Sequence, residues 1–107
     1  MMLFLGNLEG ALGDVIYGPF ETHPGTYVAA APTGTPTGTA YLPSNYAAGT
    51  SISVTITVTA FSGSTTRFVA TFTASSGNGF AKGQYIVIIS WVISGVTYRG
   101  WFNLRIY

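Results

Sequence analysis

The clearest pattern in the chain is an alternation of apolar and polar side chains over residues 51–61. Isoleucine, valine or alanine occupies every second position from 52 to 60, with serine or threonine between them. Successive strand side chains point to opposite faces, so this pattern predicts a half-buried strand. Residues 67–74 repeat the alternation, and the turn-forming residues 62–65 predict a hairpin. The expected inward set of its second strand is Phe68, Ala70, Phe72 and Ala74.

Residues 84–93 differ because both alternating sets are apolar. A strand of this kind is usually central in a covered sheet or lies at a subunit interface. Ser94-Gly95 then predicts a turn into a last strand over residues 96–107. The expected outward set of that strand is Thr97, Arg99, Trp101, Asn103, Arg105 and Tyr107.

The first half of the chain is less regular. Residues 14–21 resemble a strand in which Gly18-Pro19 indicates a bulge or a sheet edge. Residues 27–31 and 39–42 are short strand candidates. No segment has the pattern of a good helix. These elements predict an all-β fold, an immunoglobulin-like antiparallel β-sandwich of about seven strands over residues 14–107. Residues 1–13 lie outside the pattern and are expected to form an N-terminal arm.

Charge is scarce and unevenly placed. Asp, Glu, Lys and Arg make up 7% of the chain, against about a quarter in an average soluble domain. None of them occurs between Thr22 and Thr66. Charged side chains keep small proteins soluble and protect sheet edges, so we expect this chain to pack among other subunits. All three acids precede residue 22 and all four bases follow residue 66. Either the oppositely charged ends form ion pairs, within a subunit or between neighbours, or the separation reflects chance.

The 107 residues form one domain, and the lack of cysteine rules out disulfides and thiolate metal sites. The net charge of +1 gives no field that would attract nucleic acid or an anionic membrane. No apolar stretch is long enough for a membrane helix, and the short apolar start does not predict a signal peptide. We therefore expect a soluble product that is made in a cytoplasm and binds neither nucleic acid nor membrane.

Candidate chemistry is sparse. Glu21 and His23 project to the same side of an extended stretch, which is half of a metal or proton-transfer site or else a solvated strand end. No third ligand is predicted, and phosphate-loop, EF-hand and zinc-binding spacings are absent. The sequence therefore predicts no enzyme, no catalytic residue, no metal and no cofactor.

The outward row of the last strand has the most distinctive surface chemistry. Arginine beside tryptophan and tyrosine allows cation–π stacking, and these residue types are enriched at interface hot spots. Three interpretations stay open: a protein–protein contact, a face partly covered by the other sheet or the arm, and a platform for sugar or single-stranded nucleic acid.

The chain also resembles a group of small virion proteins of tailed bacteriophages. The resemblance covers residues 14–107 and lies in an early strand ending Phe20-Glu21-Thr22, the central hairpin, Gly83-Gln84-Tyr85, and the closing Phe102-Asn103-Leu104-Arg105-Ile106. It implies a non-enzymatic structural role in the virion, as capsid decoration (cement). The alternatives are a tail, baseplate or fibre-attachment component, or a carbohydrate-binding host-adhesion module.

On this basis the expected partners are further copies of the chain and other virion proteins, the major capsid protein or tail proteins. We also expect that removing residues 1–13 weakens assembly more than folding. The residues predicted to make the protein contacts are Met1, Met2, Leu3, Phe4, Leu5, Trp91, Arg99, Trp101, Arg105 and Tyr107.

Overall fold

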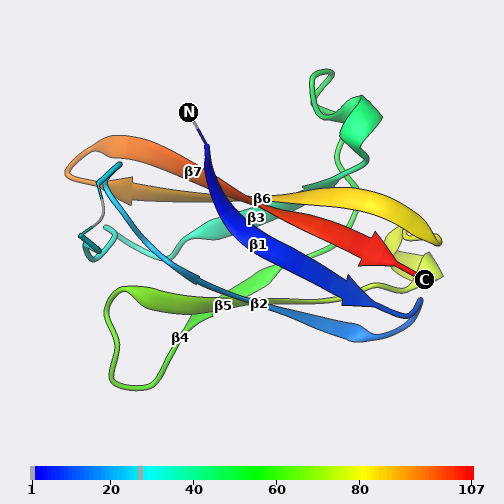
Figure 1. The fold of residues 1–107 in the computed structure, drawn as a ribbon, viewed down its shortest axis with the longest axis horizontal. Coiled ribbons are helices and arrows are strands. Elements are labelled where there is room, and N and C mark those ends of the chain that lie inside the picture. Colours follow the sequence, from blue (N-terminus) through cyan, green and yellow to red (C-terminus); the bar gives the residue numbers. More distant parts are fainter. Residues whose placement is uncertain (1, 27) are drawn as a thin grey trace.

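A computed structural model describes residues 2–26 and 28–107 and shows two β-sheets packed face to face (Figure 1). The four-stranded sheet has the order β1-β7-β6-β3, and the three-stranded sheet has the order β2-β5-β4. The strands are β1 (Leu3–Gly10), β2 (Val15–Glu21), β3 (Thr37–Tyr41), β4 (Thr57–Ala60), β5 (Arg67–Thr73), β6 (Gly83–Ile93) and β7 (Val96–Ile106). Two short 3₁₀ turns, η1 (Pro43–Asn45) and η2 (Ser76–Asn78), complete the described elements.

The predicted all-β sandwich is confirmed, with one correction to its antiparallel description. The strand order can be compared with an immunoglobulin-type sandwich, whose two sheets hold strands ABED and CFG. Here β2, β5 and β4 occupy the places of B, E and D, and β7, β6 and β3 those of G, F and C. The first strand, however, pairs with β7 and runs parallel to it. Beyond this strand order, the immunoglobulin-like assignment stays a prediction.

The expected N-terminal arm is wrong, because most of it is an integral strand. Residues Leu3–Gly10 form β1 and pair with β7 from Gly100 to Ile106. Leu5 and Leu8 pack against the core and close its side between the two sheets. Their alternation is hidden in the sequence because the register shifts between Phe4 and Gly6, where one extra residue is inserted.

The core lies between the sheets and is built by the strands with the clearest alternation. Phe68, Ala70 and Phe72 of β5 are buried, as the pattern predicts, and so are Val87 and Ile89 of β6. The ring of Phe20 joins the layers, because its centroid lies 5.8 Å from that of Phe68, 6.1 Å from Trp91 and 6.4 Å from Phe102. The sequence pattern thus placed the inner faces of β5 and β7 correctly and left the inner face of β6 open.

The predicted strand over residues 51–61 is only partly formed. Ladder pairing to β5 is limited to Thr57–Ala60, although Ile52, Val54 and Ile56 still pack against the core. The reason is that residues 51–56 change sheets. The amide of Ile52 donates to the carbonyl of Ala40 at 2.7 Å, and Tyr41 bridges to Ser51, before the chain joins β4 in the other layer.

One short strand expected in the first half of the chain is absent from the described residues. Of the strand expected over residues 27–31, Tyr27 lies outside the described residues, and residues 28–31 form no strand. The Ala30 amide instead donates to the carbonyl of Thr22, whose buried hydroxyl donates to the Ala30 carbonyl at 2.7 Å. Pro19 marks an edge strand without a bulge, because the β2–β5 register is continuous. The Ser94-Gly95 turn is confirmed, with positive φ at both positions, 51° and 80°.

Candidate protein interface

The outward side chains of β1 and β7 form one row on the four-stranded sheet. Parallel pairing sets Phe4 beside Trp101, Asn7 beside Asn103 and Glu9 beside Arg105. The Phe4 and Trp101 rings lie 4.7 Å apart at an interplanar angle of 56°. The Asn103 side-chain amide donates to Oδ1 of Asn7 at 3.2 Å. The surface predicted from β7 alone is therefore shared with the first strand.

Trp91, one of the predicted contact residues, belongs to the core. Only 2% of its surface is exposed, and its indole nitrogen donates to the His23 carbonyl at 2.9 Å. The prediction that it contacts another subunit is wrong, because β6 points this side chain between the sheets. Leu5, on β1, is half-buried and packs against the core.

The other predicted contact residues lie at or near the surface. Met1 is outside the described residues, and Met2 is half-buried with its sulfur 3.8 Å from the Tyr46 hydroxyl, which donates to it. Trp101 is half-buried beside Phe4. The exposed members are Leu3, Phe4, Arg99, Arg105 and Tyr107. Tyr107 lies beyond the end of β7, so the structure does not gather the whole predicted set into one patch.

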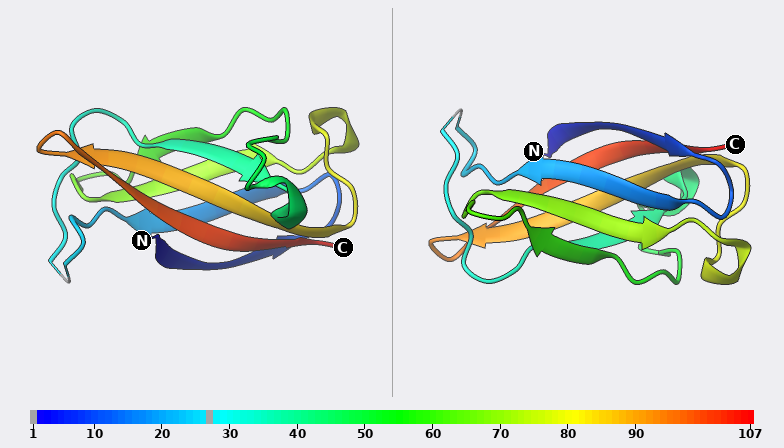
Figure 2. Two further views of the ribbon diagram at one scale, coloured as in Figure 1. Left: turned by 90° about the horizontal axis from the view of Figure 1, so that it is seen from above. Right: turned by 90° about the horizontal axis from the view of Figure 1, so that it is seen from below.

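Sequence reasoning missed a second part of this surface, on β2. Val15 and Tyr17 are 48% and 63% exposed. β1 and β2 are the edge strands of their sheets and lie along the same side of the sandwich (Figure 2). The alternation of β2 does separate Val15 and Tyr17 from the buried Ile16, but a one-dimensional pattern does not show which strands adjoin. We call the side formed by β1 and β2 the β1/β2 edge.

The two sides of the sandwich are not equivalent. On the β3/β4 side, residues 51–56 pass from one sheet to the other and bond to the backbone at the end of β3. On the β1/β2 edge, each strand has one paired neighbour, and no described segment pairs with its other side. Unpaired strand edges that carry apolar side chains are templates for pairing with another chain.

Hollows flank the strands at this edge. One of about 390 Å³ lies beside the start of β1, with Met2, Leu3, Phe4 and Tyr98 among its lining residues. A second of about 350 Å³ lies between β1 and β2 and is lined by residues that include Asn7, Glu9 and Tyr17. The edge is therefore uneven, with apolar residues beside the start of β1 and both polar and apolar residues between β1 and β2.

No family model, curated protein or solved structure matches the chain.

The predicted proximity of Glu21 and His23 is confirmed, and the contact joins the end of β2 to the loop after it. Nε2 of His23 lies 3.0 Å from a Glu21 carboxylate oxygen, and Nδ1 lies 3.0 Å from the Thr26 carbonyl. Nε of Arg67, on β5, donates to the other Glu21 oxygen at 3.4 Å. In the described parts of the chain, no three His, Asp or Glu side chains gather as metal ligands. Both ring nitrogens of His23 and both carboxylate oxygens of Glu21 thus have a polar partner, and the two contacts of His23 hold the loop after β2.

Among residues 2–26 and 28–107, no helix is long and apolar enough to cross a membrane.

Proposed function

We propose that this chain is a non-enzymatic structural subunit that binds neighbouring protein subunits through its β1/β2 edge. The observation that carries the proposal is the group of four large side chains, each 45–63% exposed, on two adjoining edge strands. They are Leu3, Phe4, Val15 and Tyr17. The scarcity of charge over the whole chain supports the same conclusion, because charged side chains are what keeps a small protein soluble and monomeric.

The resemblance to tailed-phage proteins extends this proposal to a place in a virion. We assign the chain to capsid decoration, with the major capsid protein and further copies of the chain as its partners. A tail, baseplate or fibre-attachment role is the alternative, with tail proteins as partners. Mass spectrometry of purified particles of the phage that encodes the chain tests this assignment. Copies in stoichiometric ratio to the capsid protein support decoration, a few copies per particle support the tail, and absence overturns both.

Covering these side chains supplies part of the free energy that association requires. An aromatic side chain buries about 150–250 Å², so covering the exposed half of Phe4 or Tyr17 removes about 100 Å² from water. At about 25 cal/mol per Å², each contributes about 2.5 kcal/mol before the entropy of association is subtracted. Such anchors are typical of the few residues that dominate interface energies.

We expect the double substitution Phe4→Ser with Tyr17→Ser to abolish association without unfolding the protein. Both side chains are about half exposed, 49% and 63%, so the core loses little contact. Analytical ultracentrifugation is expected to show concentration-dependent oligomers for the parent chain and monomer for the variant. The urea midpoint of unfolding of the monomer should change little.

The matched control is Phe61→Ser with Val96→Ser, two large apolar side chains that are 44% and 51% exposed away from the β1/β2 edge. This control should associate like the parent chain. If both double variants lose association equally, general surface hydrophobicity is responsible and the proposed edge is wrong. A parent chain that stays monomeric and binds no capsid or tail protein at any tested concentration contradicts the proposed function itself.

A further inference from the structure

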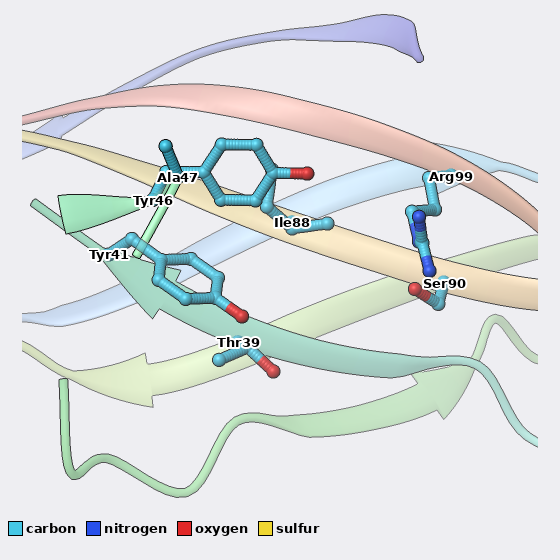
Figure 3. A pocket seen from close by; sticks show the side chains of 7 residues that line it. All are labelled: Thr39, Tyr41, Tyr46, Ala47, Ile88, Ser90 and Arg99. Atoms are coloured by element: carbon cyan, nitrogen blue, oxygen red, sulfur yellow. The ribbon is translucent and has the colours of Figure 1, made fainter. Parts of the chain in front are cut away.

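A further hollow lies on the outer face of the four-stranded sheet. It measures about 410 Å³ and is lined by residues of β3, β6, β7 and the segment around η1 (Figure 3). The segment that contains η1 stands over this face of the sheet (Figure 2, left). Ile88, only 6% exposed, contributes to the lining from the sheet. A volume of this size lies in the range of small-ligand sites.

The lining of this hollow is rich in hydroxyl groups and contains one cation. Figure 3 shows the phenol rings of Tyr41 and Tyr46 on one side and the side chains of Arg99 and Ser90 on the other. The two phenol rings meet edge to face, with centroids 5.1 Å apart at 76°. Thr39 adds a further hydroxyl. Arg99 and Ser90 are held side by side because they are opposite each other in the β6–β7 register.

These polar groups are available to a ligand. In the part of the chain that the structure describes, no side-chain hydrogen bond engages the hydroxyls of Thr39, Tyr41 or Ser90, and no ion pair engages Arg99. None of the three acidic residues lines the hollow. Among the described residues that line the hollow, the guanidinium is therefore the only charged group, and no acidic side chain among them compensates it.

We propose that this hollow binds an acidic sugar, a pyranose unit that carries one carboxylate. The planar guanidinium of Arg99 matches a carboxylate through two parallel hydrogen bonds. The hydroxyls around it donate to and accept from the hydroxyls of a sugar. The phenol rings and Ile88 provide apolar surface for the C–H groups of the pyranose ring. One positive charge suits a monoanion better than a phosphate, which carries close to two negative charges at neutral pH.

The hydroxyl groups distinguish this ligand from the acidic side chain of a partner protein. A glutamate or a chain terminus would use Arg99 but would leave the hydroxyls of Thr39 and Tyr41 without a matching partner. A uronate unit uses both the cation and the hydroxyls. The site lies at the β3 side of the face whereas β1 forms the opposite edge of the sheet, and the two are linked through Arg99, which also lines the hollow beside the start of β1.

Isothermal titration calorimetry of the full chain with a galacturonic acid trimer tests the proposal. Its methyl ester, which has the same sugar hydroxyls without the charge, and glutarate, which has carboxylates without the sugar, are the matched ligands. We expect the trimer to bind with a Kd in the millimolar range or below, and each matched ligand to bind at least about tenfold more weakly. No heat of binding with the trimer at any soluble concentration overturns the proposal.

Two variants locate the binding. Arg99→Ala is expected to weaken trimer binding by at least about tenfold, and Tyr41→Phe, which removes one hydroxyl, by a few fold. Arg105→Ala is the control, since Arg105 is an exposed arginine on the same strand outside the hollow, and it should bind like the parent chain. Equal losses in Arg99→Ala and Arg105→Ala, equal binding of the ester, or equal binding of glutarate each contradict an acidic-sugar site. The last of these would instead indicate a site for a protein carboxylate.

Discussion

Replacement of Trp91 by alanine is expected to lower the free energy of unfolding by about 3–5 kcal/mol, the range for removing a large aromatic side chain from a core. The indole is 2% exposed and stacks on Phe20, which joins the two sheets. The substitution also leaves the His23 carbonyl without its indole donor. Small domains have about 5–15 kcal/mol of stability in total, so we expect a large fall in the urea midpoint of unfolding. The fluorescence of the remaining tryptophan, Trp101, measures this midpoint.

The other tryptophan provides the control for this prediction. Trp101 is half-buried on the outer face against Phe4, so Trp101→Ala should cost only about 1–2 kcal/mol. Trp91→Phe separates packing from hydrogen bonding, because it keeps an aromatic ring and removes the donor. If Trp91→Ala and Trp101→Ala lower the midpoint equally, the assignment of one indole to the core and the other to the surface is wrong.

Deletion of residues 1–10 is expected to destabilise the fold by about 3–6 kcal/mol, rather than to weaken assembly alone. The deletion removes Leu5 and Leu8 from the core, where each half-buried leucine contributes about 1–2 kcal/mol. It also removes the backbone pairing with β7 and exposes Phe102, Leu104 and Ile106 along a new sheet edge. Urea unfolding followed by circular dichroism measures the loss. This prediction differs from the expectation drawn from the sequence, that the first thirteen residues serve assembly more than folding, because most of them form β1.

The double variant Phe4→Ser with Tyr17→Ser is the matched comparison for this deletion. It alters the same edge and keeps both strands. The double variant should therefore no longer associate, whereas the deletion should lower the free energy of unfolding. A truncated chain with an unchanged urea midpoint and reduced association would contradict the structural role of β1 and restore the interpretation of these residues as an arm.

The strands that the sequence predicted well are those in which apolar and polar side chains alternate without interruption. Phe68, Ala70 and Phe72 could be placed inside from their spacing alone, and the Ser94-Gly95 turn fixed the pairing of β6 with β7. β1 could not be found in this way, because the extra residue before Gly6 breaks its period and its partner is about a hundred positions away. Parallel pairing of the first strand with the last depends on the whole sandwich and leaves no local pattern.

The candidate interface was predicted in part for the same reason. The aromatic row on β7 followed from alternation, and its exposed members Arg99 and Arg105 were placed correctly on the outward set. Tyr17 was missed because nothing in a linear pattern states that β2 borders β1. Trp91 was misassigned because both faces of β6 are apolar, and periodicity separates two faces without showing which is inside.

By itself, the sequence determined the class of fold, the inner faces of the regular strands and the poverty of charge, because these depend on the spacing and type of neighbouring residues. Only the tertiary structure decided which strands lie at open edges, which tryptophan is buried, and that Arg99 lines the same hollow as hydroxyls of β3 and β6. Those properties arise where distant segments come together, and contacts between distant segments are set by the packing of the two sheets as a whole.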